Sequence, residues 1–179
     1  MKDLLLITPP FTQLNTPYPA TAYLKGFLNT KNISSYQIDL GIEVILEIFS
    51  KKGVTEIFNV KPKNLSENAH RIFALREEYI KTIDEVIAFL QNKKPTLARQ
   101  ICSMNFLPEA SRFNQLDDME YAFGNMGLQD KAKHLATLYL EDLSDYIIEN
   151  IDENFGFSRY AERLGRSANS FDELYEKNK

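Results

Sequence analysis

Residues 4–10, with the sequence LLLITPP, decide the fold class of this chain. The first four form an unbroken apolar run, which is typical of a strand buried on both faces of a parallel sheet. The two prolines end the run, because proline has no backbone N–H to donate to a neighbouring strand. We therefore expect a buried strand over residues 4–7, followed by a proline-bearing loop.

A helix and a second strand are expected next. Apolar residues recur at helical spacing between Ala20 and Leu28, and Asn32 tolerates the left-handed conformation that ends many helices. Residues 35–40 alternate between apolar and polar, which indicates an edge strand with one solvated face. A strand, a crossover helix and a strand make a right-handed βαβ unit with parallel strands. A flavodoxin-like order, with the second strand outside the first, fits these patterns.

The chain beyond residue 40 has mainly helical periodicity, with Ser50 and Ser66 as expected caps. A third strand at residues 54–58 is the open alternative. Two parallel strands make a poor sheet by themselves, so we expect the sheet to be incomplete in this chain. The predicted fold is an α/β, Rossmann-like or flavodoxin-like βαβ unit within residues 1–60, and a helical insertion or subdomain over residues 61–179. The expected helices cover residues 42–49, 51–58, 66–90, 96–104, 116–123 and 128–151, with short ones near Tyr160 and Leu174.

Composition narrows the functional classes. The chain has 44% hydrophobic and 26% charged residues, as a folded protein does, and a net charge of −4 with its lysines scattered among acids, so we expect no nucleic-acid partner. One cysteine, Cys102, excludes a disulfide within the chain and a site built from thiolates alone. The apolar run before Pro9 is too short for a signal peptide or a membrane span, so we expect a cytoplasmic protein without a membrane partner.

Candidate binding motifs are sparse. The loop after the first strand has no glycine, so it lacks the backbone room that a dinucleotide needs, and Asp39 is expected to cap a turn or helix rather than bind a ribose. Glu67 and His70 share the spacing of di-iron bundles, but a second such pair is missing and a solvated helix start is the expected role. His134 is expected to be a partly buried helical residue.

Two further groups are assigned structural roles. Cys102 lies in an apolar helical pattern and is expected to be a small core residue. Glu141, Asp142 and Asp145 form an acidic stretch on a helix, for which we expect a solvated face. No serine or cysteine has the surroundings of a nucleophile, so no catalytic or metal-ligating residue is assigned.

The opening of the chain resembles a known family. It shares a hydrophobic strand ending in Pro9-Pro10, a proline before a helix with an inner Tyr23-Leu24, and a strand ending in Asp39. These features are similar to the N-terminal cobalamin-binding-type domain of radical S-adenosylmethionine enzymes, many of them labelled anaerobic magnesium-protoporphyrin IX monomethyl ester cyclases. Residues 106–109, 122–124 and 135–143 look like a helical insertion of one subgroup.

The resemblance implies a function. It implies a non-catalytic accessory domain whose first loop faces cobalamin or the downstream radical core, with S-adenosylmethionine and an iron–sulfur cluster held in that core. Two departures stand out: the loop lacks the D-x-H-x-x-G cobalamin motif, and one cysteine cannot supply C-x-x-x-C-x-x-C. A cofactor-free helical protein-interaction module is the alternative. The open first strand also predicts a homodimer, or covering by the helical part. The residues expected to contact cobalamin or the downstream core through the first loop are Thr8, Pro9, Phe11, Asn15 and Tyr18.

Overall fold

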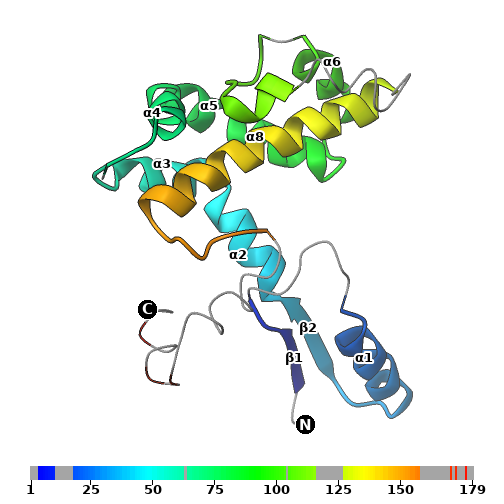
Figure 1. The fold of residues 1–179 in the computed structure, drawn as a ribbon. Coiled ribbons are helices and arrows are strands. Elements are labelled where there is room, and N and C mark those ends of the chain that lie inside the picture. The colour runs from blue at the N-terminus through cyan, green and yellow to red at the C-terminus, as the bar shows by residue number, and fades with distance from the viewer. Residues whose placement is uncertain are drawn as a thin grey trace. The chain divides into compact units, whose positions relative to one another are not determined.

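A computed structural model describes residues 4–10, 18–62, 64–103, 105–115 and 127–157, together with residues 170, 172 and 176 (Figure 1). The chain divides into two compact units, one made of Met1–Leu46 with Asn154–Lys179 and the other of Glu47–Glu153. The second unit is therefore inserted, along the sequence, into the first. The division falls before the predicted boundary at residue 60, because the helix over residues 51–59 packs on a later helix of the second unit.

The first unit contains the expected βαβ arrangement. It consists of β1 (Leu4–Thr8), α1 (Ala20–Thr30) and β2 (Ser35–Asp39), followed by the start of α2 (Leu40–Ile48). The two strands are parallel and pair in register from Leu4 with Ser35 to Thr8 with Asp39. Asn32, with φ 54°, lies just beyond α1 as the sequence predicts. Both strands, the helix and their parallel order are thus confirmed.

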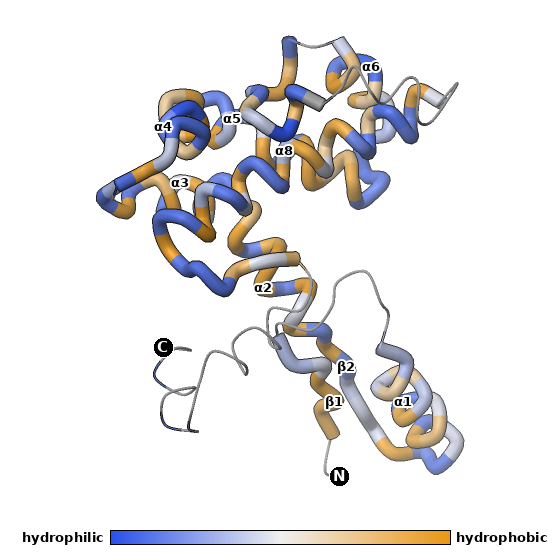
Figure 2. Tube along the Cα trace, viewed as in Figure 1, coloured by the Kyte–Doolittle hydropathy of each residue, from blue (hydrophilic) through white to orange (hydrophobic). Residues whose placement is uncertain are grey.

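The predicted burial of β1 is wrong for this chain. Leu5 is 59% exposed and Ile7 47% exposed, and β1 remains mostly apolar in Figure 2. The physical cause is that β1 has one neighbouring strand, and the sheet described here contains two strands only. A strand becomes buried on both faces only when further strands and helices surround it.

The second unit is helical. Ser50 caps the first of its short helices by accepting the Gly53 N–H at 3.0 Å, and Ser66 caps the next by accepting the Ala69 N–H at 3.2 Å. Residues 54–58 are helical, so the alternative of a third strand there is wrong. The described elements of this second unit are α3 (Lys51–Asn59), α4 (Glu67–Ala74), α5 (Arg76–Leu90), the 3₁₀ turns η1 (Pro95–Leu97) and η2 (Ser111–Gln115), α6 (Ala98–Ile101) and α8 (Leu128–Asn150).

The predicted single helix over residues 66–90 is broken at Leu75. This residue has φ −91° and ψ 12°, so it ends α4 and precedes α5. Ile72 before the break and Tyr79 after it are both fully buried, which means that both helices bury a face in the same unit. Helical periodicity did not reveal the break, because both parts of the segment keep an apolar stripe.

Aromatic side chains fill the middle of the helical unit. The rings of Phe58 and Tyr146 lie 5.1 Å apart, and those of Tyr79 and Tyr139 lie 5.0 Å apart, in tilted arrangements. The Tyr139 hydroxyl lies 3.0 Å from the Thr82 hydroxyl and donates to the Tyr79 carbonyl at 3.1 Å. This unit therefore has a packed core of its own. Within the described part of the chain, no helix has the length and apolar character needed to cross a membrane.

The other predicted helices and loops are confirmed, shortened or outside the described residues. The helix predicted over residues 128–151 is α8, and residues 106–108 lie in a loop as expected. The helix predicted over residues 96–104 is shorter and begins as a 3₁₀ turn at Pro95, where proline fits the first turn. The helices predicted for residues 116–123 and near Tyr160 and Leu174 fall outside the described residues.

Candidate functional site

The carboxyl ends of the two strands form the position where the sequence predicts a ligand. Thr8 and Asp39 are the last ladder pair, and Thr8 is buried while most of β1 is exposed. Asp39 Oδ1 accepts the Ile42 N–H at 3.2 Å, so this carboxylate caps α2, which is the structural role expected for it. The carboxyl ends of the strands thus carry the buried Thr8 side chain beside the Asp39 carboxylate, which already accepts a hydrogen bond from α2.

The other predicted contacts are spread around this edge. Pro9 follows β1 directly and is exposed, and Tyr18 lies just before α1 with 44% of its surface exposed. Phe11 and Asn15 lie outside the described residues. Of the predicted contacts that the structure describes, Pro9 and Tyr18 offer exposed side chains and none is charged, which suits an apolar or aromatic ligand better than a charged one.

The face of the sheet opposite α1 is a second candidate site. Gln37 donates to the Thr21 hydroxyl on α1 at 2.9 Å, so the face that carries Gln37 is the one next to α1. Side chains alternate along a strand, and paired residues of parallel strands share a face, so the other face carries the pairs Leu5 with Tyr36 and Ile7 with Ile38. We call these four residues the open face. Leu5, Ile7 and Tyr36 are exposed, whereas Ile38, near the carboxyl end of β2, is half-buried.

The free edge of β1 adjoins the open face. The Leu4 N–H donates to the Ser34 carbonyl at 3.1 Å, and ladder partners alternate along a strand, so Leu4, Leu6 and Thr8 direct their backbone groups to β2. The N–H and C=O groups of Leu5 and Ile7 therefore point away from β2. In the described part of the chain no strand pairs with this edge.

Metal-binding groups do not gather in the described residues, where no cluster of three or more histidine, cysteine, aspartate or glutamate side chains is found. Glu67 and His70 lie exposed at the start of α4, as the solvated-helix interpretation expects, and His134 is half-buried. Cys102 is half-buried rather than a core residue, and its thiol donates to the Leu128 carbonyl at 3.7 Å. Burial raises the pKa of this thiol, which makes a reactive thiolate less available.

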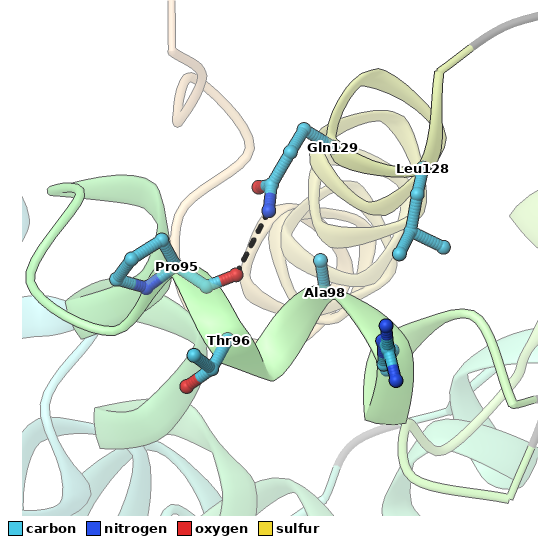
Figure 3. Close-up of a pocket in the computed structure, with 6 residues that line it drawn as sticks. Pro95, Thr96, Ala98, Leu128 and Gln129 are labelled. Atoms are coloured by element: carbon cyan, nitrogen blue, oxygen red, sulfur yellow. Dashed lines mark hydrogen bonds between the residues drawn. The ribbon is translucent and has the colours of Figure 1, made fainter.

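A pocket of about 530 Å³ lies between η1, α6 and the start of α8 (Figure 3). The Gln129 side-chain amide donates to the Pro95 carbonyl at 2.9 Å across it. Its remaining lining residues are Thr96, Ala98, Arg99 and Leu128, and Arg99 is the one charged group among them. The described lining residues include no paired acid and base, so they form no catalytic arrangement by themselves.

A second pocket, of about 460 Å³, lies at the break between α4 and α5. One wall is helical and carries Arg71, Leu75 and Glu78, while residues 105–109 form the opposite wall. Residues 110–112 continue this loop wall, and the side chain of Asp142 binds them to α8.

Asp142 is a buried carboxylate at the centre of the helical unit, with 0% of its surface exposed. Its Oδ2 accepts the Ala110 N–H at 3.1 Å and its Oδ1 accepts the Arg112 N–H at 3.2 Å. Asp142 thus holds the start of η2 on α8. Asn68 of α4 adds a third contact by accepting the Ser111 N–H at 3.1 Å.

Arg112 adds an ionic contact between the same two segments. Its Nε and Nη2 atoms donate to the two carboxylate oxygens of Asp145, each at 2.7 Å, and its Nη1 lies 3.7 Å from Glu141. Two parallel hydrogen bonds fix the guanidinium in one orientation. We call Asp142, Tyr79, Arg112, Asp145 and Glu141 the Asp142 cluster.

Burial changes the acidity of this cluster. Removal from water raises the pKa of Asp142 to about 6, which outweighs the opposite effect of the two N–H donors. Burial, and then the charge of Asp142, raise the pKa of Tyr79 far above its usual value, so this phenol stays neutral. The carboxylate is near enough to act on the Tyr79 hydroxyl, although the two do not reach ordinary hydrogen-bond geometry and the hydroxyl has no other partner among the described residues.

The solvated face predicted for Glu141, Asp142 and Asp145 is wrong for Asp142. Helical spacing places Asp142 beside Leu135, Tyr139 and Tyr146, which all point into the core. This apolar stripe in the sequence indicates that position 142 faces the core, but the nearby Glu141 and Asp145 favoured the interpretation of a solvated acidic face. The segment that supplies the N–H donors lies some 30 residues earlier in the chain, so the role of Asp142 depends on tertiary contacts.

Comparisons with family models, with curated proteins and with solved structures find no match for this chain.

Proposed function

We propose that this chain is a non-catalytic accessory domain whose parallel sheet is completed by strands and helices of a neighbouring segment. The observation that carries the proposal is the open face together with the free edge of β1. Parallel strands with continuous apolar sequence normally lie inside α/β sheets with layers on both sides. Leu5 and Ile7 offer both unpaired backbone groups and exposed apolar side chains to such a neighbour.

The order of the units along the chain supports a Rossmann-like or flavodoxin-like plan. In that plan the helix after the second strand leads back to a third strand beside the first. Here α2 leads instead into the helical unit, and the chain returns to the first unit from Asn154. The helical unit then corresponds to an insertion between the second and third strands of the completed sheet.

The resemblance of residues 4–40 extends the proposal to a particular class of enzyme. We assign the chain to the N-terminal, cobalamin-binding-type domain of a cytoplasmic radical S-adenosylmethionine enzyme related to magnesium-protoporphyrin monomethyl ester cyclases. Thr8, Pro9, Phe11, Asn15 and Tyr18 are the proposed contacts of the first loop. The exposed Pro9 and Tyr18 side chains are suited to pack against the corrin ring, and no histidine ligand for cobalt lies in this loop.

Two experiments test this assignment separately. Titration with hydroxocobalamin, followed by visible absorption, should give saturable binding that Tyr18→Ala weakens and Tyr23→Ala, on α1, leaves unchanged. Absence of saturable binding in the full-length protein removes the corrinoid role. The coding sequence after Lys179 should contain three closely spaced cysteines for the cluster, and a stop codon at that position removes the radical-core assignment.

A cofactor-free interaction module remains the second candidate, because α1 also exposes an apolar stripe. Tyr23 is 78% exposed, and Leu24 and Phe27 on the same helix face are exposed as well. Stripes of this kind dock against protein partners in a helix-to-groove or helix-to-sheet manner. If Tyr18→Ala leaves the activity of the full-length enzyme intact while Tyr23→Asp abolishes it, the interaction role is favoured over cofactor binding.

A further inference from the structure

The Asp142 cluster joins two segments that local sequence does not bring together. Residues 105–115 have no sheet or long helix to hold them, and they bury Leu107, Ala110 and Phe113 against the helical unit. The polar contacts to α8 come from Asp142 and from the ion pair of Arg112 with Asp145. One buried carboxyl group, that of Asp142, therefore takes a direct part in the attachment of this segment.

We propose that Asp142 couples the binding of a single proton to the docking of residues 105–115 on α8, with the proton favouring the docked segment. When the segment opens, the Asp142 carboxyl meets water and is easily ionised. When the segment is docked, the carboxyl is fully shielded from water beside the neutral Tyr79 phenol, and this loss of hydration outweighs the two N–H donors from Ala110 and Arg112. The docked state consequently holds the proton more tightly than the open state does.

The other charged groups near Asp142 come from each element packed against it. Arg112 in η2 opposes the protonation of Asp142, whereas Asp145, which lies on α8 as Asp142 does, favours it. Tyr79 of α5 stays neutral, and Arg71 of α4 acts on Tyr79. Glu141 on α8 lies 3.7 Å from Arg112, so the guanidinium interacts with both Glu141 and Asp145. Since Arg112 is bound by these two acids, its charge is partly compensated, and its effect on the pKa of Asp142 is smaller than that of burial.

The sign of the effect follows from the shift. The pKa of Asp142 rises from 3.8 to about 6 in the docked state, so docking is strongest at low pH, weakens as the pH rises between these values, and is constant above them. Between pH 5 and pH 7.5 this linkage corresponds to about a tenfold increase in the open population. Opening exposes Leu107 and Phe113 and removes the loop wall of the pocket at the α4–α5 break.

Amide hydrogen exchange of the intact chain tests the proposal. Protection factors of the Ala110 and Arg112 amides, corrected for the intrinsic pH dependence of exchange, should fall about tenfold from pH 5 to pH 7.5 in the wild type. Asp142→Asn should abolish this change, and the matched variant Asp130→Asn, exposed near the start of α8, should retain it. An unchanged wild-type protection factor, or the same fall in Asp142→Asn, overturns the proposal.

A second measurement avoids any folding defect of the variant. The side-chain carboxyl carbon of Asp142 in the wild-type chain can be followed by NMR across the same pH range. A titration midpoint near 6 supports the proposal. Any midpoint clearly above the ordinary value of 3.8 for aspartate has the same meaning, whereas a midpoint at or below 3.8 overturns the proposal, because the docked state would then have no preference for the proton.

Discussion

Leu5 lies opposite Tyr36 in the parallel ladder, and both side chains lie on the sheet face away from α1. Both are more than half exposed, an unusual condition for adjacent apolar residues of a parallel sheet. Their exposure links the incompleteness of the sheet to the proposed docking role.

The isolated chain should self-associate through the open face and the free edge of β1. Leu5→Lys should abolish the association, because a charged side chain on an edge strand opposes pairing with another strand. Sedimentation velocity across a wide range of concentrations measures it. Asn29→Lys is the control, since it places the same charge on an exposed polar residue of α1, outside the apolar stripe of that helix. A wild-type chain that stays monomeric at every concentration would contradict the prediction.

Gly53→Ala should destabilise the helical unit by about 1–3 kcal/mol, the usual cost of forcing extra atoms into a packed site. A Cβ at Gly53 would lie 2.2 Å from the Glu47 carbonyl oxygen and 2.4 Å from that of Ile48, so the backbone itself has to move. Urea unfolding followed by circular dichroism measures the loss. Gly26→Ala on α1 meets no atom within 4 Å and should cause no loss. Equal stability of Gly53→Ala and wild type would show that the two helices adjust freely.

Tyr139→Phe and Tyr79→Phe should differ, although both tyrosines are fully buried. Tyr139→Phe removes the hydroxyl bound to Thr82 and to the Tyr79 carbonyl, and should cost about 1–2 kcal/mol. Tyr79→Phe removes a hydroxyl that has no ordinary hydrogen bond, so it should be neutral or slightly stabilising. Urea midpoints of the two variants decide the matter. A larger loss in Tyr79→Phe would indicate that its contact with Asp142 is a true hydrogen bond.

Arg112→Lys should lower the stability of the helical unit by about 0.5–1 kcal/mol, because an ammonium group cannot make the two parallel hydrogen bonds to Asp145. The loss should shrink in high salt, since the pair is partly exposed. Lys52→Ala is the control: its partner Glu47 is also well exposed, and its removal should have no measurable effect. Thermal unfolding at two salt concentrations provides the comparison.

Several elements could be predicted because their signals are local. Ser50 and Ser66 cap their helices through hydrogen bonds to residues three positions on, and Asn32 ends α1 by its own backbone conformation. The parallel pairing of β1 and β2 also follows from short-range order, since a helix between two strands leaves one favoured connection. Such features need few residues to be in place.

Other features escaped prediction because they depend on what surrounds a residue. An apolar run indicates that a strand is suited to burial, but exposure is decided by the neighbouring strands and helices, and β2 is the one strand that pairs with β1 in the described part of the chain. The break at Leu75 is similarly hidden in a continuous apolar stripe.

By itself, the sequence determined the order of strands and helices, the caps, and the suitability of Leu4–Thr8 for a sheet interior, because these depend on backbone preferences and on spacing along one segment. Only the tertiary structure decided that Asp142 is buried and bound to residues 110 and 112, and that Leu5 and Tyr36 form an open face. Burial and the pKa of an acid are set by groups far apart in the chain, which spacing within one helix or strand does not specify.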